Sequence, residues 1–253
     1  MALDKNSNAF TFIFAIAMVV VVGAVLSFTA MSLKPLQVQN NVEKKMISIL
    51  SSFGVEADRD NAPDKFYEYI TKRMTLNAKG EVISTREGEV DPQDLEDPFN
   101  VDVRKEYRNP ELSVDDRNYP LYIAEVEGQQ VAVLPMVGKG LWGPVWGYVS
   151  LESDFNTIYG ATFDHKSETP GLGAEIKEDW FSDPFIGKKI YNDEGNLVSV
   201  NVIKGSAAPD NPHAVDGITG GTITSNGVDE MLERTFGVYD AYFKNNTQIS
   251  QIP

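Results

Sequence analysis

The chain has 253 residues, enough for one membrane anchor and one domain of moderate size. Its 37 Asp and Glu against 22 Lys and Arg give a formal net charge of −15, which makes nucleic acid and anionic membrane surfaces poor partners. The lack of cysteine excludes disulfides, thiolate catalysis, iron–sulfur clusters and Cys-based zinc sites. The two histidines, His165 and His213, have no ligand-like spacing, which favours structural roles and predicts no metal site.

The first element in chain order is an uncharged apolar run at residues 10–33, after a short flank at 1–9. As a helix rising about 1.5 Å per residue it is long enough to cross a bilayer. A cleaved signal peptide is less favoured, because it would have a shorter apolar core and a small-residue cleavage site. Lysines lie on both sides of the run, so the positive-inside rule leaves the orientation undecided.

Residues 34–118 are expected to form a helical connector and an acidic surface segment. Apolar residues at helical spacing predict a helix over 40–53, and Pro63 is typical of the start of a second helix over 63–73. The stretch 87–116 is rich in Asp, Glu and Pro with few periodic apolar residues, which indicates a solvated surface segment. A cation site on its carboxylates is the weaker alternative.

Short runs rich in β-branched and aromatic residues then predict a sheet built of hairpins. The expected strands are 121–126, 130–134, 145–151, 157–161, 188–191 and 197–203, with a helix near 175–180 between the last hairpin and the final two strands. The predicted fold class is α+β, with a twisted, largely antiparallel sheet flanked by helices and one N-terminal transmembrane helix. The main domain is expected at 119–244, followed by a polar tail at 245–253.

Two glycine-rich loops interrupt this part of the chain. The first, at residues 138–144, carries Leu141 and Trp142 at its tip, and its glycines would let a flat ligand approach while the two apolar side chains pack on it. A hairpin loop whose Trp covers the core explains the same residues. The second loop, at 168–175, contains a Pro170-Gly171 turn and is weak evidence by itself.

The stretch DGITGGTITSNG at residues 216–227 has the strongest functional pattern. Gly220 and Gly221 place Thr222 on a tight turn, and an amphipathic helix over 228–244 is expected to follow, capped by Ser225 or Asn226. The positive end of that helix would favour a phosphate near Thr222 or Thr224. A glycine turn with nothing bound fits the spacing equally well, and no Lys follows the glycines as in a P-loop.

Together the N-terminal span and the segments GKGLWGPVWGYV, ETPGLGAEI and DGITGGTITSNGV resemble the NqrC family, FMN-binding subunits of bacterial Na+-translocating NADH:quinone reductases. The resemblance covers nearly the whole chain. In that family an Asp is followed after two residues by Ser or Thr, Gly, Ala and Thr, and the last Thr carries FMN through a phosphoester bond. Thr222 matches that Thr and Thr224 is the second choice, whereas Gly221 departs from the usual Ala.

The resemblance implies an electron-transfer subunit that positions covalent FMN and has no catalytic residue of its own. The remaining FMN-binding residues that it implies are Gly140, Leu141, Trp142, Glu168, Thr169, Gly171, Leu172, Thr219, Gly220, Gly221, Thr224 and Ser225. It further implies partner subunits in a sodium-transporting complex that uses NADH and ubiquinone, and a separate flavin transferase that attaches the flavin from FAD. The domain would lie on the periplasmic side of the bacterial inner membrane.

Two alternatives remain at this stage. The flavin-carrying subunit of the related Rnf ferredoxin:NAD+ oxidoreductase has the same flavin motif, although the long segment 34–118 favours the NqrC family. A non-redox, membrane-anchored binding module, whose glycine loops hold a sugar or peptide and whose Thr222 stays unmodified, is the alternative from another class.

Overall fold

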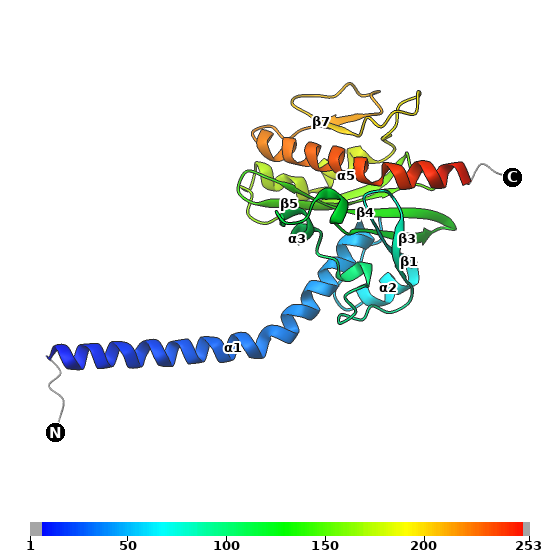
Figure 1. Ribbon diagram of the computed structural model, residues 1–253. Helices are drawn as coiled ribbons and strands as arrows, with labels where there is room; N and C mark the ends of the chain where they lie inside the picture. Colours follow the sequence, from blue (N-terminus) through cyan, green and yellow to red (C-terminus); the bar gives the residue numbers. More distant parts are fainter. Residues whose placement is uncertain (1–6, 250–253) are drawn as a thin grey trace. The chain divides into compact units, whose positions relative to one another are not determined.

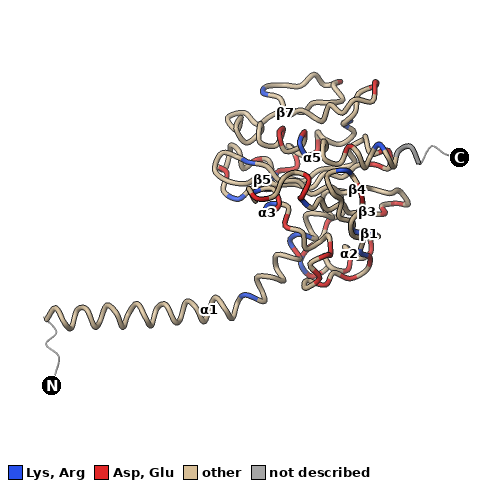
Figure 2. Tube along the Cα trace, in the orientation of Figure 1, with Lys and Arg blue, Asp and Glu red and all other residues tan. Residues whose placement is uncertain are grey.

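The computed structural model describes residues 7–249, which fall into two compact units that meet between Lys45 and Met46. The predicted flank at 1–9 and tail at 245–253 lie partly outside the described residues. Helix α1 (Asn8–Ser51) is, within 7–249, the one helix long and apolar enough to cross a membrane. Its first part carries no charged residue (Figure 2), in agreement with the predicted span at 10–33. Residues 40–51 of α1 correspond to the connector helix predicted over 40–53.

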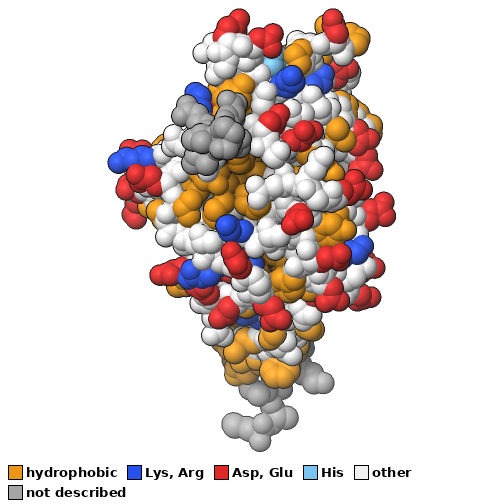
Figure 3. Space-filling model, turned by 90° about the vertical axis from the view of Figure 1, so that its right-hand side faces the viewer, with side chains coloured by type: hydrophobic (Ala, Val, Ile, Leu, Met, Phe, Trp, Pro, Cys, Tyr) orange, Lys and Arg blue, Asp and Glu red, His pale blue; other side chains and the backbone are white. Residues whose placement is uncertain are grey.

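The second unit is built on a six-stranded antiparallel sheet, so the predicted α+β class is confirmed (Figure 1). Its strand order is β2-β1-β3-β4-β5-β6. The strands are β1 (Ile70–Leu76), β2 (Val82–Arg86), β3 (Tyr119–Val126), β4 (Gln129–Lys139), β5 (Pro144–Leu151) and β6 (Ile158–His165). The last four form consecutive hairpins where the sequence predicts them. Acidic side chains are spread over the surface of this unit (Figure 3).

The long helix α5 (Thr222–Ile249) packs along the sheet and supplies much of the core (Figure 1). Met231, Phe236 and Tyr239 lose nearly all contact with solvent, because they recur on one helical face and meet the apolar side chains of β4 and β5. A small parallel pair, β7 (Asn201–Ile203) and β8 (Ala214–Asp216), is tied to the same helix. There the Asp229 carboxylate accepts a hydrogen bond of 2.7 Å from the Val202 N–H.

Two predictions for the first half of this unit are wrong. Helix α2 (Ala62–Tyr69) ends before Arg73, because the chain turns extended at Ile70 and enters β1. The acidic stretch 87–116 is more than a solvated segment, since it buries Asp97 and Phe99. It also forms the short helices η1 (Pro98–Asn100), α3 (Val103–Arg108) and η2 (Val114–Asp116).

The predicted strands at 188–191 and 197–203 are largely absent. They are reduced to two isolated bridges, Thr157 with Lys189 and Tyr191 with Leu197, and to the short strand β7. The helix expected near 175–180 is broken into η3 (Gly173–Lys177), α4 (Asp179–Ser182) and η4 (Asp183–Phe185). This region is a compact set of turns, which places Phe181 and Phe185 against Phe163 of β6.

Two glycines let α5 cross the end of β4 at close range. A Cβ built on Gly138 would lie 2.7 Å from the Gly227 carbonyl oxygen, and a Cβ on Gly227 would collide with the carbonyl group of Lys139. Both obstacles are backbone atoms, which cannot rotate away as a side chain can. The first turns of α5 are therefore held against the loop that follows β4.

Gly227→Ala is expected to destabilise the protein by about 1–3 kcal/mol, because the added methyl group forces α5 away from β4. Gly237→Ala is the matched control in the same helix: nothing lies within 4 Å of its added Cβ. There the better helix propensity of Ala should stabilise by roughly 0.5–1 kcal/mol. Urea unfolding of both variants measures the contrast, and equal effects of the two substitutions would contradict it.

Candidate functional site

The helix behind the glycine turn begins at Thr222 and not at residue 228. The prediction that Ser225 or Asn226 caps it is therefore wrong, because both lie inside its first turns. Ser225 instead closes the preceding turn: its buried hydroxyl accepts a hydrogen bond of 2.9 Å from the Ile218 N–H. Gly220, with φ of +79°, turns the chain into the helix. Thr222 thus occupies the first helical position, where backbone N–H groups lack intrahelical acceptors.

The carboxylate of Glu168 joins the three sequence motifs into one site. Its Oε1 accepts a hydrogen bond of 2.8 Å from the Trp142 N–H in the first glycine loop. Its Oε2 accepts one of 2.6 Å from the hydroxyl of Thr224 in α5. Glu168 itself comes from the second loop and is only 5% exposed. One buried acidic group therefore holds both loops to the start of the helix.

Glycines make room for that carboxylate. A Cβ on Gly140 would lie 2.6 Å from Glu168 Oε1, and a Cβ on Gly173 would lie 2.7 Å from Oε2 and collide with the Thr224 hydroxyl. The side chain of His165 contributes as well, since its Nδ1 accepts a hydrogen bond of 3.1 Å from the Glu168 N–H. His165 thus has a structural role, as predicted. Its position in the sequence did not indicate that this role lies at the site.

The hydrogen bonds to Glu168 keep it ionised. Burial by itself would raise the pKa of this carboxyl, but the hydroxyl of Thr224 and the backbone N–H groups of Trp142, Leu141 and Gly143 outweigh it and lower the pKa below the ordinary value of 4.5. A carboxylate that accepts several hydrogen bonds in the folded state favours folding while it is charged. The link that the ionised Glu168 makes between the two loops and α5 therefore depends on pH.

The stability that Glu168 contributes is expected to vanish in acid. Because its pKa is lower in the folded protein than in the unfolded chain, the contribution is complete above about pH 4.5 and is lost as pH falls through the folded pKa. In thermal melts, wild type should exceed Glu168→Gln in melting temperature by a constant margin from pH 6 to 7. That margin should shrink below pH 4.5. A margin independent of pH would show that the carboxylate charge has no such role.

The loops that Glu168 joins to the start of α5 carry exposed apolar side chains, which we call the apolar rim. Leu141 and Trp142 are 50% and 65% exposed, and Leu172 from the second loop is 41% exposed. Leu172 lies over Gly220, where an added Cβ would come within 2.7 Å of it. Ile223, which the sequence analysis did not single out, adds a fourth apolar side chain at 55% exposure. Thr222 is half-buried beside this rim.

The other predicted site residues lie either in the second loop or in the turn before α5. Thr169 and Gly171 shape the loop under Leu172: the Thr169 carbonyl accepts hydrogen bonds from two backbone N–H groups, and Gly171 has φ of +75°. Thr219 is exposed on the turn, whereas Gly221 is buried. A Cβ on Gly221 would lie 2.9 Å from Ile218, so the Ala usual in the resembling family would require Ile218 to shift.

Comparison with known proteins places this site in a family. The model of the FMN-binding domain family matches residues 140–236. The NqrC subunit of the Na(+)-translocating NADH-quinone reductase of Vibrio alginolyticus is 32% identical over 243 residues, covering 94% of this chain and 93% of the relative. The same subunit of Neisseria meningitidis serogroup B is 31% identical over 244 residues, covering 92% of each chain.

Solved structures also match the fold of this chain. The crystal structure of the same reductase subunit from Parabacteroides distasonis matches with a TM-score of 0.71 and 41% identity, covering 83% of this chain and 96% of that chain. The structure of Shewanella oneidensis NqrC, at 24% identity and a TM-score of 0.66, shares the fold. These relatives do not favour the Rnf alternative. The chain belongs to the NqrC family of Na(+)-translocating NADH-quinone reductase subunits.

Proposed function

We propose that this chain is an electron-transfer subunit of a Na+-translocating NADH:quinone reductase and that it carries FMN covalently bound to Thr222. The observation that carries the proposal is the convergence of the two glycine-rich loops on the start of α5 through Glu168, within the range matched by the FMN-binding domain family. The complex as a whole has the enzymatic turnover, and this chain contributes a carrier of electrons.

The hydroxyl groups near the start of α5 favour Thr222 as the attachment point. Thr224 and Ser225 are 2% and 3% exposed, and each hydroxyl is already engaged within the protein. Thr222 is more accessible and lies at the positive end of a 28-residue helix. A phosphate bound there would be stabilised by the free backbone N–H groups and by the helix dipole.

Attachment requires a second protein in this proposal. A flavin transferase would present FAD, and the Thr222 oxygen would form a bond to the phosphorus of the FMN half. The phosphoanhydride bond of FAD would break, AMP would leave, and the hydroxyl proton would pass to solvent or to a base of the transferase. The half-buried position of Thr222 beside exposed loops supports access by such an enzyme.

The bound FMN supplies reversible electron uptake and release, and the chain's residues position it. Leu141, Trp142 and Leu172 would offer apolar surface to the flat ring of the FMN. Glu168 fixes the two loops, so that the rim keeps its shape when electrons move. The segment 10–33 of α1 would anchor the chain in the bacterial inner membrane as a single span, with the FMN-binding domain at 119–244 on the periplasmic side.

The test uses the full chain expressed with its complex and a flavin transferase. After denaturing electrophoresis, the band of this chain should fluoresce as flavin, and the native protein should copurify with an NADH-oxidising subunit. A colourless band from such cells would refute the covalent attachment, and a native protein without flavin would favour the non-redox binding module. Copurification with a ferredoxin-linked subunit would favour the Rnf alternative.

A further inference from the structure

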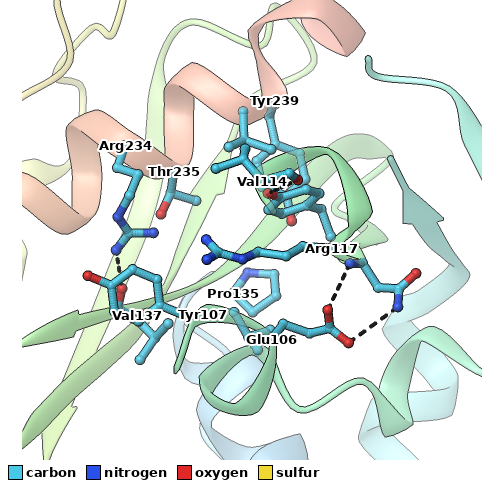
Figure 4. A pocket seen from close by; sticks show the side chains of 13 residues that line it. Glu106, Tyr107, Val114, Arg117, Pro135, Val137, Arg234, Thr235 and Tyr239 are labelled. Carbon is cyan, nitrogen blue, oxygen red and sulfur yellow. Dashed lines mark hydrogen bonds between the residues drawn. The ribbon is translucent and has the colours of Figure 1, made fainter. Parts of the chain in front are cut away.

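A pocket lies between α3, β4 and α5 and shares no residue with the glycine-rich loops or the turn of the candidate FMN site (Figure 4). Its walls are largely apolar, from Val103, Val114, Pro135, Val137 and Val238. Two guanidinium groups, those of Arg117 and Arg234, face the same pocket together with Tyr107. We call it the Arg117 pocket.

The size of the Arg117 pocket limits what it can hold. It is partly open to solvent, and its cavity volume is about 40 Å³. A water molecule takes about 30 Å³ in the liquid, and small-molecule sites usually measure about 300–1,000 Å³. The pocket therefore admits one small polar group, such as a carboxylate, and excludes a nucleotide or a second flavin.

Arg117 has only weak polar partners within the described residues, the Leu112 carbonyl and the Tyr119 hydroxyl. Its Nε atom is buried without a hydrogen-bond acceptor, and Nη2 donates to the Leu112 carbonyl at a long 3.4 Å. Within residues 7–249 no carboxylate oxygen comes within 4 Å of this guanidinium. A buried donor without an acceptor is unfavourable, so this group is suited to an added anion.

The other charged side chains that line the pocket already have ion-pair or hydrogen-bond partners. Arg234 pairs with Glu230 at 2.6 Å and donates to the Val137 carbonyl. Glu106, the pocket's own acid, accepts hydrogen bonds from the backbone and side chain of Asn118 (Figure 4). Neither acid neutralises Arg117.

Both guanidinium groups also lie near one aromatic ring. The Arg234 carbon Cζ is 4.1 Å and that of Arg117 is 5.8 Å from the centre of the Tyr107 ring. Figure 4 shows Arg117 reaching toward Tyr107 and Arg234 across the pocket. Each cation is attracted to the ring. Because Arg234 already pairs with Glu230, Arg117 is the cation that an added anion would neutralise.

We propose that the Arg117 pocket binds the carboxylate of an Asp or Glu side chain from a neighbouring subunit. The space admits only the head of the ligand, so the remainder must lie outside, as it does when one protein inserts a side chain into another. Arg and Tyr set in apolar surroundings are the residues that dominate the binding energy of protein interfaces. The source of the carboxylate rests on the proposed place of this chain in a complex, whereas the pocket chemistry does not.

The first test uses acetate as the probe and the full chain in detergent. Thermal melts are compared in sodium acetate and sodium chloride at equal pH and ionic strength. At ten times its dissociation constant, acetate should raise the melting temperature of wild type by roughly 3–6 °C relative to chloride. Arg117→Met, which keeps an apolar stem, should lose this difference.

The matched control is Arg104→Met. Arg104 lies on the same short helix as three of the pocket's residues but outside the pocket, 5.0 Å from the ring of Trp146, and is exposed. This variant should keep the full acetate effect. Equal melting temperatures of wild type in the two salts would overturn the proposal, as would an acetate effect that survives in Arg117→Met.

The second test uses the assembled complex and identifies the source of the carboxylate. Arg117→Met should lower by at least tenfold the fraction of this subunit retained after a high-salt wash, while Arg104→Met should match wild type. Unchanged retention would refute the neighbouring-subunit assignment. Flavin fluorescence of the denatured band is read in the same samples, so a failure of flavin attachment is distinguished from a failure of this docking site.

Discussion

A Thr222→Ala variant produced alongside the flavin transferase is expected to carry no covalent flavin. Intact and peptide mass analysis of wild type should show an added mass equal to FMN less one water, located on the peptide that contains Thr222. The variant should lose this adduct completely, because Ala has no hydroxyl to form the phosphoester. Its stability should change little, since Thr222 is half-buried and its side chain is not part of the packed core.

The matched control for this prediction is Thr224→Val. It removes the neighbouring hydroxyl, and with it the hydrogen bond to Glu168, but keeps the shape of the side chain. If Thr222 is the attachment point, Thr224→Val should keep the adduct on Thr222. An adduct that maps to Thr224 in wild type would leave the electron-transfer role standing and show that the residue assignment is wrong.

The hairpin strands could be predicted because their signals are local. From Tyr119 to His165, short runs rich in β-branched and aromatic residues, separated by glycine turns, specify four antiparallel strands without information from distant segments. The glycine loops were equally visible. Their convergence was not, since it depends on Glu168, whose two hydrogen bonds reach 26 and 56 residues along the chain.

The start of α5 was misplaced for a related reason. Gly227 lowers helix propensity and Ser225 is a favourable cap. Propensity and capping rules applied to the sequence therefore place the start of the helix about two turns too late. In the folded protein the need for close contact with Lys139 selects glycine at 227, and Ser225 bonds back to Ile218. Tertiary contacts therefore decide both residues, and they bring Thr222 to the first turn of the helix.

Strand β1 was missed because its first four residues, including Arg73, were assigned to the helix predicted over 63–73. Arg73 is in fact 1% exposed, and its partner Asp97, at 2%, comes from the acidic segment that was expected to be solvated. Arg73 Nε and Nη2 donate to the two carboxylate oxygens of Asp97 at 3.0 and 2.7 Å. Nη1 donates to the Gly88 carbonyl at 2.6 Å. This pair fastens the acidic segment to the sheet.

Arg73→Met is therefore expected to be the most destabilising of the substitutions considered, at about 3–5 kcal/mol, because it leaves the Asp97 carboxylate buried without its cation. In a unit of this size the melting temperature should fall by roughly 6–20 °C. Urea unfolding of the full chain in detergent measures the loss. Arg86→Met is the control, since Arg86 pairs with Asp94 and Glu96 at the surface and its loss should matter little.

A double-mutant cycle separates the ion pair from simple loss of packing. Asp97→Asn keeps an oxygen that can accept from the Phe99 N–H, at 2.8 Å in the wild type, but removes the charge that Arg73 neutralises. Once that charge is gone, Arg73→Met no longer leaves a buried carboxylate without its cation. The double variant should thus be more stable than the sum of the two single losses predicts, by about 0.5–3 kcal/mol. Additive losses would mean that Arg73 acts through its apolar stem and its bonds to backbone carbonyls, and that the acidic segment is held to the sheet by other contacts.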